Sequence, residues 1–363
     1  MKPQRLSNIS TPALVIDLSV MENNIRLMAQ AFASGPCKLR PHFKAHKTPE
    51  IARRQLAAGS CVGITCATVG EAEVAAGLCD DVLIANEVLG NDKCRRVAAL
   101  AKSIDVKVAV DSEQGLREIS MAARDANSEV GVLVEVNIGF RAGTQPGQPA
   151  AALAQRVAET DGVRLRGLMG YEGAAMGIPE RDKREAAARA AVGRLLVSVT
   201  AVSDAGLPCE IVSAGGTGTY DITGRMEGVT EIQAGSYVLM DTEYAKQDLP
   251  FAKAFWVLGT VISRPGATTV TADCGHKSCT QDHGMPQVKD LPGATVMFLA
   301  DEHAMIGVPP GCSLGPGDRV ALWPSHIDPT INLHDMIYVA EGEHVVDVWP
   351  VAARGYIEQR RES

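Results

Sequence analysis

Basic side chains are concentrated in the stretch Arg40-Pro41-His42-Phe43-Lys44-Ala45-His46-Lys47. Residues 39–44 are typical of a short buried strand, and Thr48-Pro49 is a helix start, with Thr48 as N-cap and Pro49 at the first helical position. Lys44 is therefore expected where a strand ends and a loop begins, the place where α/β proteins carry chemistry. A partly desolvated amine among cationic neighbours is a competent nucleophile, which indicates Schiff-base formation with a carbonyl. A solvated basic turn is the alternative interpretation.

Two further segments combine glycines with hydroxyl side chains. They are Ser213-Ala214-Gly215-Gly216-Thr217-Gly218-Thr219 and Gln233-Ala234-Gly235-Ser236-Tyr237, and each ends an expected strand. Glycines allow close backbone approach, successive N–H groups form an anion nest, and hydroxyls add donors. No P-loop lysine follows, so a nucleotide triphosphate is not indicated. Together with Lys44, these segments predict a phosphate site for the commonest carbonyl cofactor, pyridoxal phosphate; a flexible glycine-rich loop is the alternative.

A third constellation is Trp323-Pro324-Ser325-His326-Ile327-Asp328-Pro329-Thr330. In an extended chain, residues two apart point the same way, so His326 and Asp328 can share one metal ion. An imidazole and a carboxylate suit a divalent ion such as Mn, Mg or Zn. The alternative is a surface turn in which Asp328 caps a loop. Nearby acidic and histidine side chains are expected to be mostly solvated, with His303 or His283 as candidates to face the site.

The elements around these residues alternate between short apolar strands and amphipathic helices. We expect a first strand over 11–17 and a helix over 19–33, and then a regular series. The expected strands of the series are 39–44, 63–67, 81–85, 106–110, 131–136, 165–171, 210–214 and 230–234. The clearest helices are 70–78, 91–101, 112–126, 148–159 and 179–205. Eight units in series favour an α/β fold with a closed parallel (β/α)8 barrel over an open doubly wound sheet.

The pattern changes after about residue 244. Residues 255–351 contain short strands with period-two alternation, and Pro-Gly pairs recur between them. We expect strands over 256–261, 268–272, 319–323 and 344–349. These features predict a barrel domain over 18–248 and an all-β domain built from 1–17 and 249–363, with the first strand of the chain joining the second domain.

Composition excludes several classes of protein. The chain has 363 residues, 46% of them hydrophobic, which is enough for a full core. The net charge of -8 argues against nucleic acid and anionic membranes as partners. Residues 1–10 are polar and no apolar run approaches a membrane span, so we expect a cytoplasmic protein. The nine cysteines include no CxxC pair, and we interpret them, including Cys66 and Cys209 in expected strands, as reduced thiols.

The motifs together resemble D-threonine aldolases, within the pyridoxal-phosphate enzymes of the alanine racemase type, a group that also contains D-serine dehydratases. The resemblance runs from about Thr11 to Gly355. Its carriers are Thr11-Pro12, the Lys44 stretch, Glu71-Ala72, Asn86-Glu87-Val88, the two glycine-rich segments, Met240-Asp241 and residues 324–330. The last motif discriminates best, because the aldolases carry HxD there and the dehydratases carry HxC.

The resemblance implies an N-terminal barrel, a C-terminal β domain, a homodimer, a Schiff base on Lys44 and a divalent ion on His326 and Asp328. Gly216, Thr217, Gly218, Thr219, Gly235, Ser236 and Tyr237 would contact the cofactor. His42, Arg141 and Tyr171 are candidates to orient the ring and its phenolic oxygen. Gln233 stands near the place of the alanine racemase arginine that contacts the ring nitrogen, and it is neutral.

Three positions depart from the family pattern. Ala67-Thr68 replaces the usual Gln-Lys, Glu172 replaces the usual histidine after Tyr171, and the segment 139–143 is one residue shorter than usual. These departures bear on substrate choice.

The expected activity is cleavage of a D-β-hydroxy-α-amino acid of the D-threonine type to glycine and an aldehyde. The alternatives are a D-serine-type dehydratase, a D-3-hydroxyaspartate aldolase, a racemase with two opposed proton carriers and no metal, and a cofactor-binding homeostasis protein. The β domain with its His and Asp pair argues against the last of these.

Overall fold

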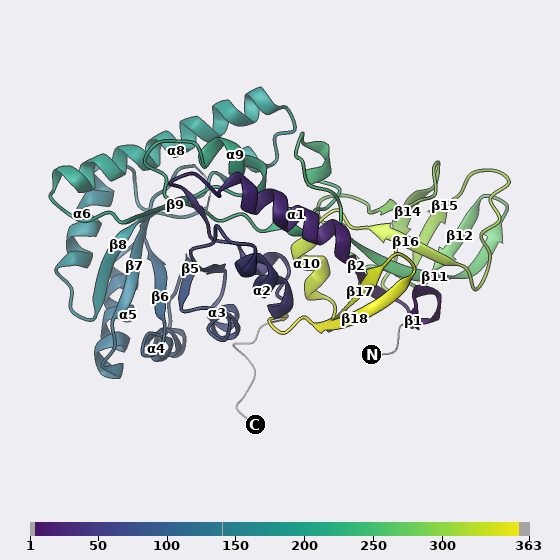
Figure 1. Ribbon diagram of the computed structural model, residues 1–363, viewed down its shortest axis with the longest axis horizontal. Helices are drawn as coiled ribbons and strands as arrows, with labels where there is room; N and C mark the ends of the chain where they lie inside the picture. The colour runs from purple at the N-terminus through teal and green to yellow at the C-terminus, as the bar shows by residue number, and fades with distance from the viewer. Residues whose placement is uncertain (1–3, 140, 356–363) are drawn as a thin grey trace. The chain divides into compact units, whose positions relative to one another are not determined.

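The computed structural model describes residues 4–139 and 141–355. The chain divides into two compact units (Figure 1). The barrel unit contains residues 28–44 and 51–235, and the sheet unit contains the described residues up to 27, 45–50 and 236–355. The domain boundaries predicted between residues 17 and 18 and between residues 248 and 249 stay a prediction. Residues 1–3 and 356–363 of the predicted β domain lie outside the described residues.

The barrel unit is built on eight parallel strands. In spatial order they are β3 (Lys38–Leu39), β10 (Glu231–Ile232), β9 (Ile211–Ala214), β8 (Val163–Met169), β7 (Val130–Glu135), β6 (Asp105–Val110), β5 (Asp81–Glu87) and β4 (Ile64–Cys66). Parallel bridges from Leu39 to Cys61 and from His42 to Thr65 join the two ends of this order. The Thr65 amide donates to the Pro41 carbonyl at 2.9 Å. The sheet therefore closes, which confirms the barrel over the open sheet.

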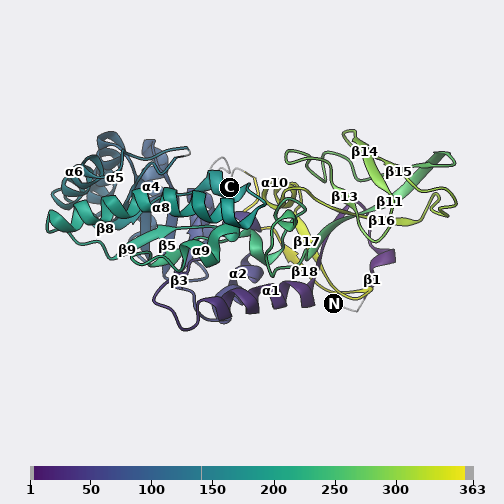
Figure 2. The same cartoon turned by 90° about the horizontal axis from the view of Figure 1, so that it is seen from above.

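Helices follow the strands and cover the outside of the barrel (Figure 2). They are α3 (Val69–Ala75), α4 (Asn91–Leu100), α5 (Glu113–Ala126), α6 (Gln148–Ala158), α7 (Gly173–Met176), α8 (Arg181–Asp204) and α9 (Tyr220–Thr223). Their limits come from local signals. The Ser112 hydroxyl accepts the Gly115 amide and caps the start of α5, and Asn127 ends it in the left-handed region at φ 51°.

Helix α8 is long and apolar enough to cross a membrane by length and composition, the one such helix among the described residues. We expected no apolar run that approaches a membrane span, and α8 contradicts this expectation by length and composition alone. The helix buries Ala188, Val192, Leu195 and Val202 within the barrel unit. A barrel helix that buries one side can have the same length and apolar composition.

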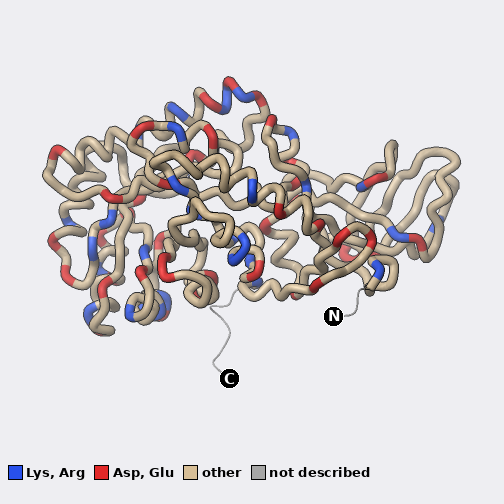
Figure 3. Tube along the Cα trace, viewed as in Figure 1, with Lys and Arg blue, Asp and Glu red and all other residues tan. Residues whose placement is uncertain are grey.

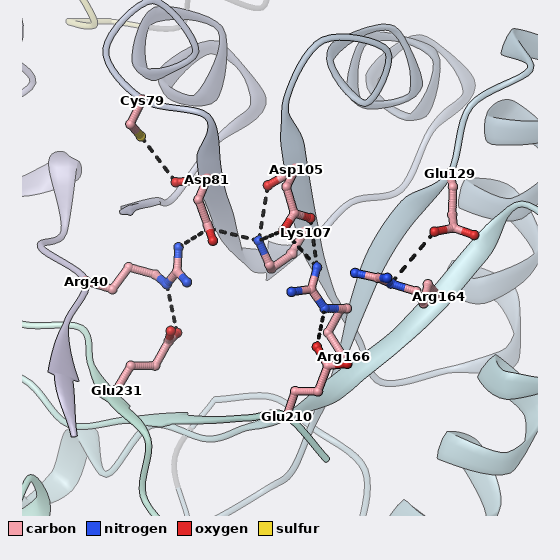
Figure 4. A network of polar contacts seen from close by, with 10 residues as sticks. All are labelled: Arg40, Cys79, Asp81, Asp105, Lys107, Glu129, Arg164, Arg166, Glu210 and Glu231. Atoms are coloured by element: carbon pink, nitrogen blue, oxygen red, sulfur yellow. Dashed lines mark hydrogen bonds and ion pairs between the residues drawn. The ribbon is translucent and has the colours of Figure 1, made fainter. Parts of the chain in front are cut away.

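The inside of the barrel is layered, because residues two apart on a strand point to the same face. Asp81 and Leu83 of β5 illustrate this alternation, as do Lys107 and Ala109 of β6. Leu83 and Ala109 pack with Leu133, Met169 and Ile211 as one apolar layer. Below it, around the beginnings of the strands, lies a layer of paired charges (Figure 4).

This layer of paired charges, the charged floor of the barrel, is a continuous network. Arg40 pairs with Glu231 at 2.8 Å and with Asp81, and Lys107 pairs with Asp81 at 2.8 Å and with Asp105 at 2.9 Å. Arg166 continues it to Asp105 and Glu210, at 2.8 and 2.9 Å. A Cβ added to Gly131 would lie 2.7 Å from the Lys107 side chain, so glycine leaves room for the buried lysine. The sequence did not predict this layer, because each charge stands singly among apolar strand residues.

The sheet unit contains a mixed ten-stranded sheet. Its main path runs β1 (Gln4–Arg5), β18 (His344–Pro350), β17 (Met336–Glu341), β2 (Ala13–Asp17), β11 (Phe255–Gly266), β12 (Thr269–Ala272), β15 (Ala304–Gly307) and β14 (Thr295–Leu299). Strand β16 (Arg319–Trp323) pairs with β11, and β13 (Gln287–Val288) pairs with β16. Strand β2 lies between β11 and β17, which confirms that the first expected strand joins this sheet.

Among the described residues, three α-helices begin or lie in the sheet unit. They are α1 (Leu18–Ala31) and α2 (Pro49–Ala57), which start there, and α10 (Ile327–Asn332), so this unit, expected to be all-β, contains helices as well. The apolar cluster beneath the sheet includes Val15, Trp256, Leu258 and Val345. Within the described ranges all nine cysteines are free thiols. Cys66 lies in β4 as expected, whereas Cys209 precedes β9 and is outside a strand.

Candidate active site

The sequence predicted that Lys44 ends a strand. Lys44 instead lies in the short 3-10 helix η2 (Phe43–Ala45). Strand β3 is only two residues long, and the chain turns into η2 from Phe43 onward. The amides of Arg40 and His42 still bond to the carbonyls of Ile232 and Ala234, at 2.8 and 3.0 Å. These bonds hold the segment beside β10, so Lys44 remains at the carboxyl end of the barrel. The helix predicted after it is confirmed as α2 (Pro49–Ala57).

The loop after β9 is shaped by two glycines. Gly215 has φ +76°, and a Cβ there would lie 2.7 Å from the Ile232 side chain. A Cβ on Gly216 would lie 3.1 Å from Met176 and 3.6 Å from the Tyr171 ring. The chain then forms the 3-10 helix η3 (Thr217–Thr219), whose residues are buried. The result is a tight backbone turn, in which the Gly216 amide donates to the Thr219 hydroxyl at 3.3 Å.

Two buried charged side chains hydrogen-bond to this loop and hold it in place. Glu172 is 2% exposed and accepts hydrogen bonds from the Gly215 amide at 3.0 Å and from the Thr219 and Thr223 hydroxyls at 2.8 and 2.6 Å. The Arg184 guanidinium donates to the Gly218 carbonyl at 2.9 Å. The Thr219 hydroxyl is thus bonded to Glu172, and its predicted contact with a phosphate stays a prediction. Sequence reasoning noted Glu172 as a departure but missed this role.

The predicted barrel residues lie at the ends of neighbouring strands. The spatial order β3, β10, β9, β8 brings His42 and Lys44 next to Gln233 and Gly235, then the glycine loop, then Tyr171. The Gln233 amide donates to the Ser213 hydroxyl at 2.8 Å, which ties β10 to β9. Carboxyl ends of parallel strands are where barrels carry their sites.

Arg141 follows β7 and is held by carboxylates of the neighbouring strand ends. Its guanidinium lies 3.2 and 3.3 Å from the two Glu135 oxygens, 3.4 Å from Glu87 and 3.1 Å from the Asn86 oxygen. Burial, followed by the nearby Glu87 carboxyl, raises the pKa of Glu135 to about 8, although Arg141 opposes the shift. The shortened segment around Arg141 includes Phe140, which lies outside the described residues.

The remaining predicted residues belong to the sheet unit. Ser236 and Tyr237 are in the 3-10 helix η4 (Ser236–Val238), directly after Gly235 in the chain. Tyr237 is fully buried and its ring lies 5.6 Å from that of Phe251. Its predicted cofactor contact stays a prediction.

His326 and Asp328 do not lie in an extended segment, so that part of the sequence argument is wrong. His326 is the N-cap residue of α10 and Asp328 is in its first turn. The helix start still brings the side chains together, with 3.8 Å between the His326 Nε2 and an Asp328 oxygen. Bonds of about 2.0–2.2 Å from nitrogen and oxygen to an ion fit between atoms at that separation.

A buried aspartate fixes this helix start. Asp241 is 1% exposed and accepts the Ile327 amide at 3.1 Å, while its other oxygen accepts the amides of Glu243 and Tyr244. Burial raises the pKa of Asp241 to about 6, against the effect of these backbone hydrogen bonds. The family motif Met240-Asp241 therefore has a structural role beside the His326 and Asp328 pair.

The residues present fit both groups that the sequence predicted. The Lys44 amine at the carboxyl end of the barrel, a glycine loop that leaves no room for a Cβ on Gly215, and hydroxyls on the next turn are a donor set that fits pyridoxal phosphate. An imidazole nitrogen facing a carboxylate oxygen is the donor set for a borderline divalent ion.

Comparison with known proteins defines the class. Residues 16–243 match the family described as "Alanine racemase, N-terminal domain", and residues 254–340 match a serine dehydratase domain. The fold and these matches are those of pyridoxal-phosphate enzymes of the alanine racemase type.

The most similar relatives narrow this class. A D-threonine aldolase of Arthrobacter sp is 39% identical over 97% of this chain and 94% of its own. A 3-hydroxy-D-aspartate aldolase of Paracoccus denitrificans is 33% identical, over 96% and 93%. The crystal structure of D-threonine aldolase from Filomicrobium marinum has a TM-score of 0.92 and 38% identity, over 97% and 96%. The chain belongs to the D-threonine aldolase family of pyridoxal-phosphate-dependent lyases.

Proposed function

We propose that this protein is a pyridoxal-phosphate- and divalent-metal-dependent aldolase that cleaves D-β-hydroxy-α-amino acids of the D-threonine type to glycine and an aldehyde. The observation that carries the proposal is the pair of His326 and Asp328, whose ligand atoms face each other at 3.8 Å. The HxD motif resembles that of the aldolases, whereas the dehydratases carry cysteine in the aspartate position.

Most of the predicted residues have a role in this proposal. Lys44 supplies the amine that attaches the cofactor, and Gly216, Thr217 and Gly218, with Gly235 and Ser236, bind its phosphate. His42, Tyr171 and Arg141 orient its ring and phenolic oxygen. When bound, pyridoxal phosphate supplies an electron sink for charge at the substrate Cα.

His326 and Asp328 would hold the divalent ion. Such an ion lowers the pKa of a bound hydroxyl, here the β-hydroxyl of the substrate. Removal of that proton is what cleavage of the bond between Cα and Cβ requires. We therefore expect EDTA to abolish activity and added Mn²⁺ to restore it. Activity that survives complete removal of metal would contradict the metal dependence.

A 3-hydroxy-D-aspartate aldolase is the second candidate, supported by the similarity to the Paracoccus denitrificans enzyme. The experiment that separates the candidates is a comparison of kcat/KM for D-threonine, D-3-hydroxyaspartate and D-serine. The proposal predicts the highest value for D-threonine. A preference for D-3-hydroxyaspartate would favour the second candidate, and 2-oxo acids in place of aldehydes would show a dehydratase.

We further propose that the enzyme is a cytoplasmic homodimer, as the family resemblance implies. Light scattering after size-exclusion chromatography measures the oligomeric state directly. A monomer at micromolar concentration with full activity would contradict this part of the proposal.

A further inference from the structure

Besides Asp328, two side chains of one loop contact the His326 ring. Asp282 and His283 lie between Cys279 and Met285 in the sheet unit. An Asp282 oxygen is 2.5 Å from the His326 Nδ1. The His283 ring stacks on the His326 ring, with 3.9 Å between centroids and 9° between the planes. The ligand atoms of these three residues lie within 4.8 Å of one another.

The two carboxylate distances to His326 show which carboxylate can bind the ion and which one is a hydrogen-bond partner of the histidine. An ion with bonds of about 2.0–2.2 Å does not fit between the Asp282 oxygen and Nδ1 at 2.5 Å without an acute angle. It does fit between Nε2 and Asp328 at 3.8 Å. The contact of Asp282 is therefore a hydrogen bond, in which Nδ1–H donates and the carboxylate accepts.

This hydrogen bond selects the tautomer. A proton on Nδ1 leaves the lone pair on Nε2, the atom that faces Asp328. Histidine ligands in proteins commonly donate their second N–H to a carboxylate, which fixes the ring and makes it a better ligand. The stacked His283 ring covers one face of His326 and restricts rotation of the ring.

We infer that Asp282 and His283 are positioning residues of the metal centre: Asp282 orients the His326 imidazole through Nδ1, and His283 holds its plane by stacking. The inference rests on the proposed metal dependence and extends it beyond the HxD pair. His283 acts through its ring and not through a nitrogen, because it lies parallel to the plane of the ligand that it supports.

The test is Mn²⁺ binding to the pyridoxal-phosphate-loaded enzyme, measured as loss of the free Mn²⁺ electron paramagnetic resonance signal. We expect Asp282→Asn to weaken binding by about 10- to 100-fold, the usual effect of losing such a partner. His283→Ala should weaken binding, whereas His283→Phe, which keeps a stacking ring, should leave it unchanged. Asp301→Asn is the matched control, since Asp301 is an exposed aspartate of the same unit, 4.0 Å from Lys277.

The outcomes are distinguishable. Wild-type affinity in Asp282→Asn would overturn the role of Asp282. Equal losses in His283→Phe and His283→Ala would make His283 a ligand and overturn the stacking role. If the wild-type enzyme itself binds no Mn²⁺, the proposed metal dependence fails, and this inference fails with it. Thermal unfolding of each variant without metal shows whether a loss of affinity reflects a loss of fold.

Discussion

Lys44 carries the covalent chemistry of the account at the scale of single residues. In Lys44→Ala the amine is absent, so we predict loss of the visible absorbance band of the bound cofactor and loss of activity. The measurement is an absorbance spectrum of purified protein after dialysis with pyridoxal phosphate. Lys93→Ala is the control, because Lys93 is exposed on α4. A persistent band in Lys44→Ala would assign the attachment to another lysine.

Glu135 is the residue whose protonation has the clearest consequence for stability. Its pKa is raised from 4.5 to about 8, chiefly by burial and then by the Glu87 carboxyl. The folded state therefore holds an extra proton between these pH values. Its contribution to stability is complete below about pH 4.5 and is lost as the pH rises through about 8.

We predict that Glu135→Gln removes this part of the pH dependence. Urea unfolding at several pH values between roughly 5 and 9, the window in which the raised pKa of this carboxyl acts, measures the pH dependence. The free energy of unfolding of the wild type should fall more steeply with rising pH than that of the variant. Parallel curves would show that Glu135 ionises normally.

At the scale of elements, the glycine loop after β9 depends on backbone that only glycine adopts without strain. We predict that Gly215→Ala destabilises the fold by about 1–2 kcal/mol from the left-handed conformation, with more from the contact with Ile232. Cofactor affinity should fall with it, because the loop shapes the anion nest. Gly177→Ala is the matched control, since φ is -87° there and a Cβ meets nothing within 4 Å.

Urea unfolding and titration with pyridoxal phosphate measure the two effects on Gly215→Ala. Unchanged stability and affinity would contradict the role of this loop. A loss of stability alone would restrict Gly215 to the fold.

The elements also show which features of the site the sequence can predict. The alternation of strand and helix periods predicted the eight units, and helix starts such as Thr48-Pro49 are local signals. The length of β3 was overestimated, because the chain turns into the 3-10 helix η2 at Phe43 and does not stay extended to Lys44. The motif around His326 was expected to be extended, yet Asp241 captures the Ile327 amide and a helix begins there.

The missed residues have partners that are distant in sequence. Glu172 bonds to Gly215, Thr219 and Thr223, between 43 and 51 residues away. Asp282 bonds to His326, 44 residues away. No periodicity or spacing rule connects such pairs, so only the fold shows these contacts. The signals available in the sequence were a polar residue among glycines, for Glu172, and a residue beside a second histidine, for Asp282.

At the scale of the whole molecule, the charged floor of the barrel joins charged side chains of several strands in one network (Figure 4). Lys107 is fully buried and pairs with Asp81 and Asp105. We predict that Lys107→Met destabilises the enzyme by about 2 kcal/mol, because Asp81 and Asp105 each lose a charged hydrogen-bond donor and keep only Arg40 and Arg166 as partners.

The control for this prediction is Lys183→Met, which removes an exposed pair with Glu180 and should change stability by about 0–1 kcal/mol. Urea unfolding measures both variants. Equal stability of the two variants would show that the floor network is energetically neutral.

Acidic and basic residues are mixed along the molecule. Figure 3 shows basic and acidic residues interspersed along the chain, consistent with the net charge of -8 being no single patch. The proposed amino acid substrate is a zwitterion without net charge, so groups within the site and not long-range attraction must recognise it.

The measurement that tests the central claim most directly is quantification of products from D-threonine with pyridoxal phosphate and Mn²⁺. The account predicts glycine and acetaldehyde in equal amounts, with no product after treatment with EDTA. Formation of 2-oxobutyrate and ammonia in place of glycine, or undiminished cleavage in EDTA, would contradict it.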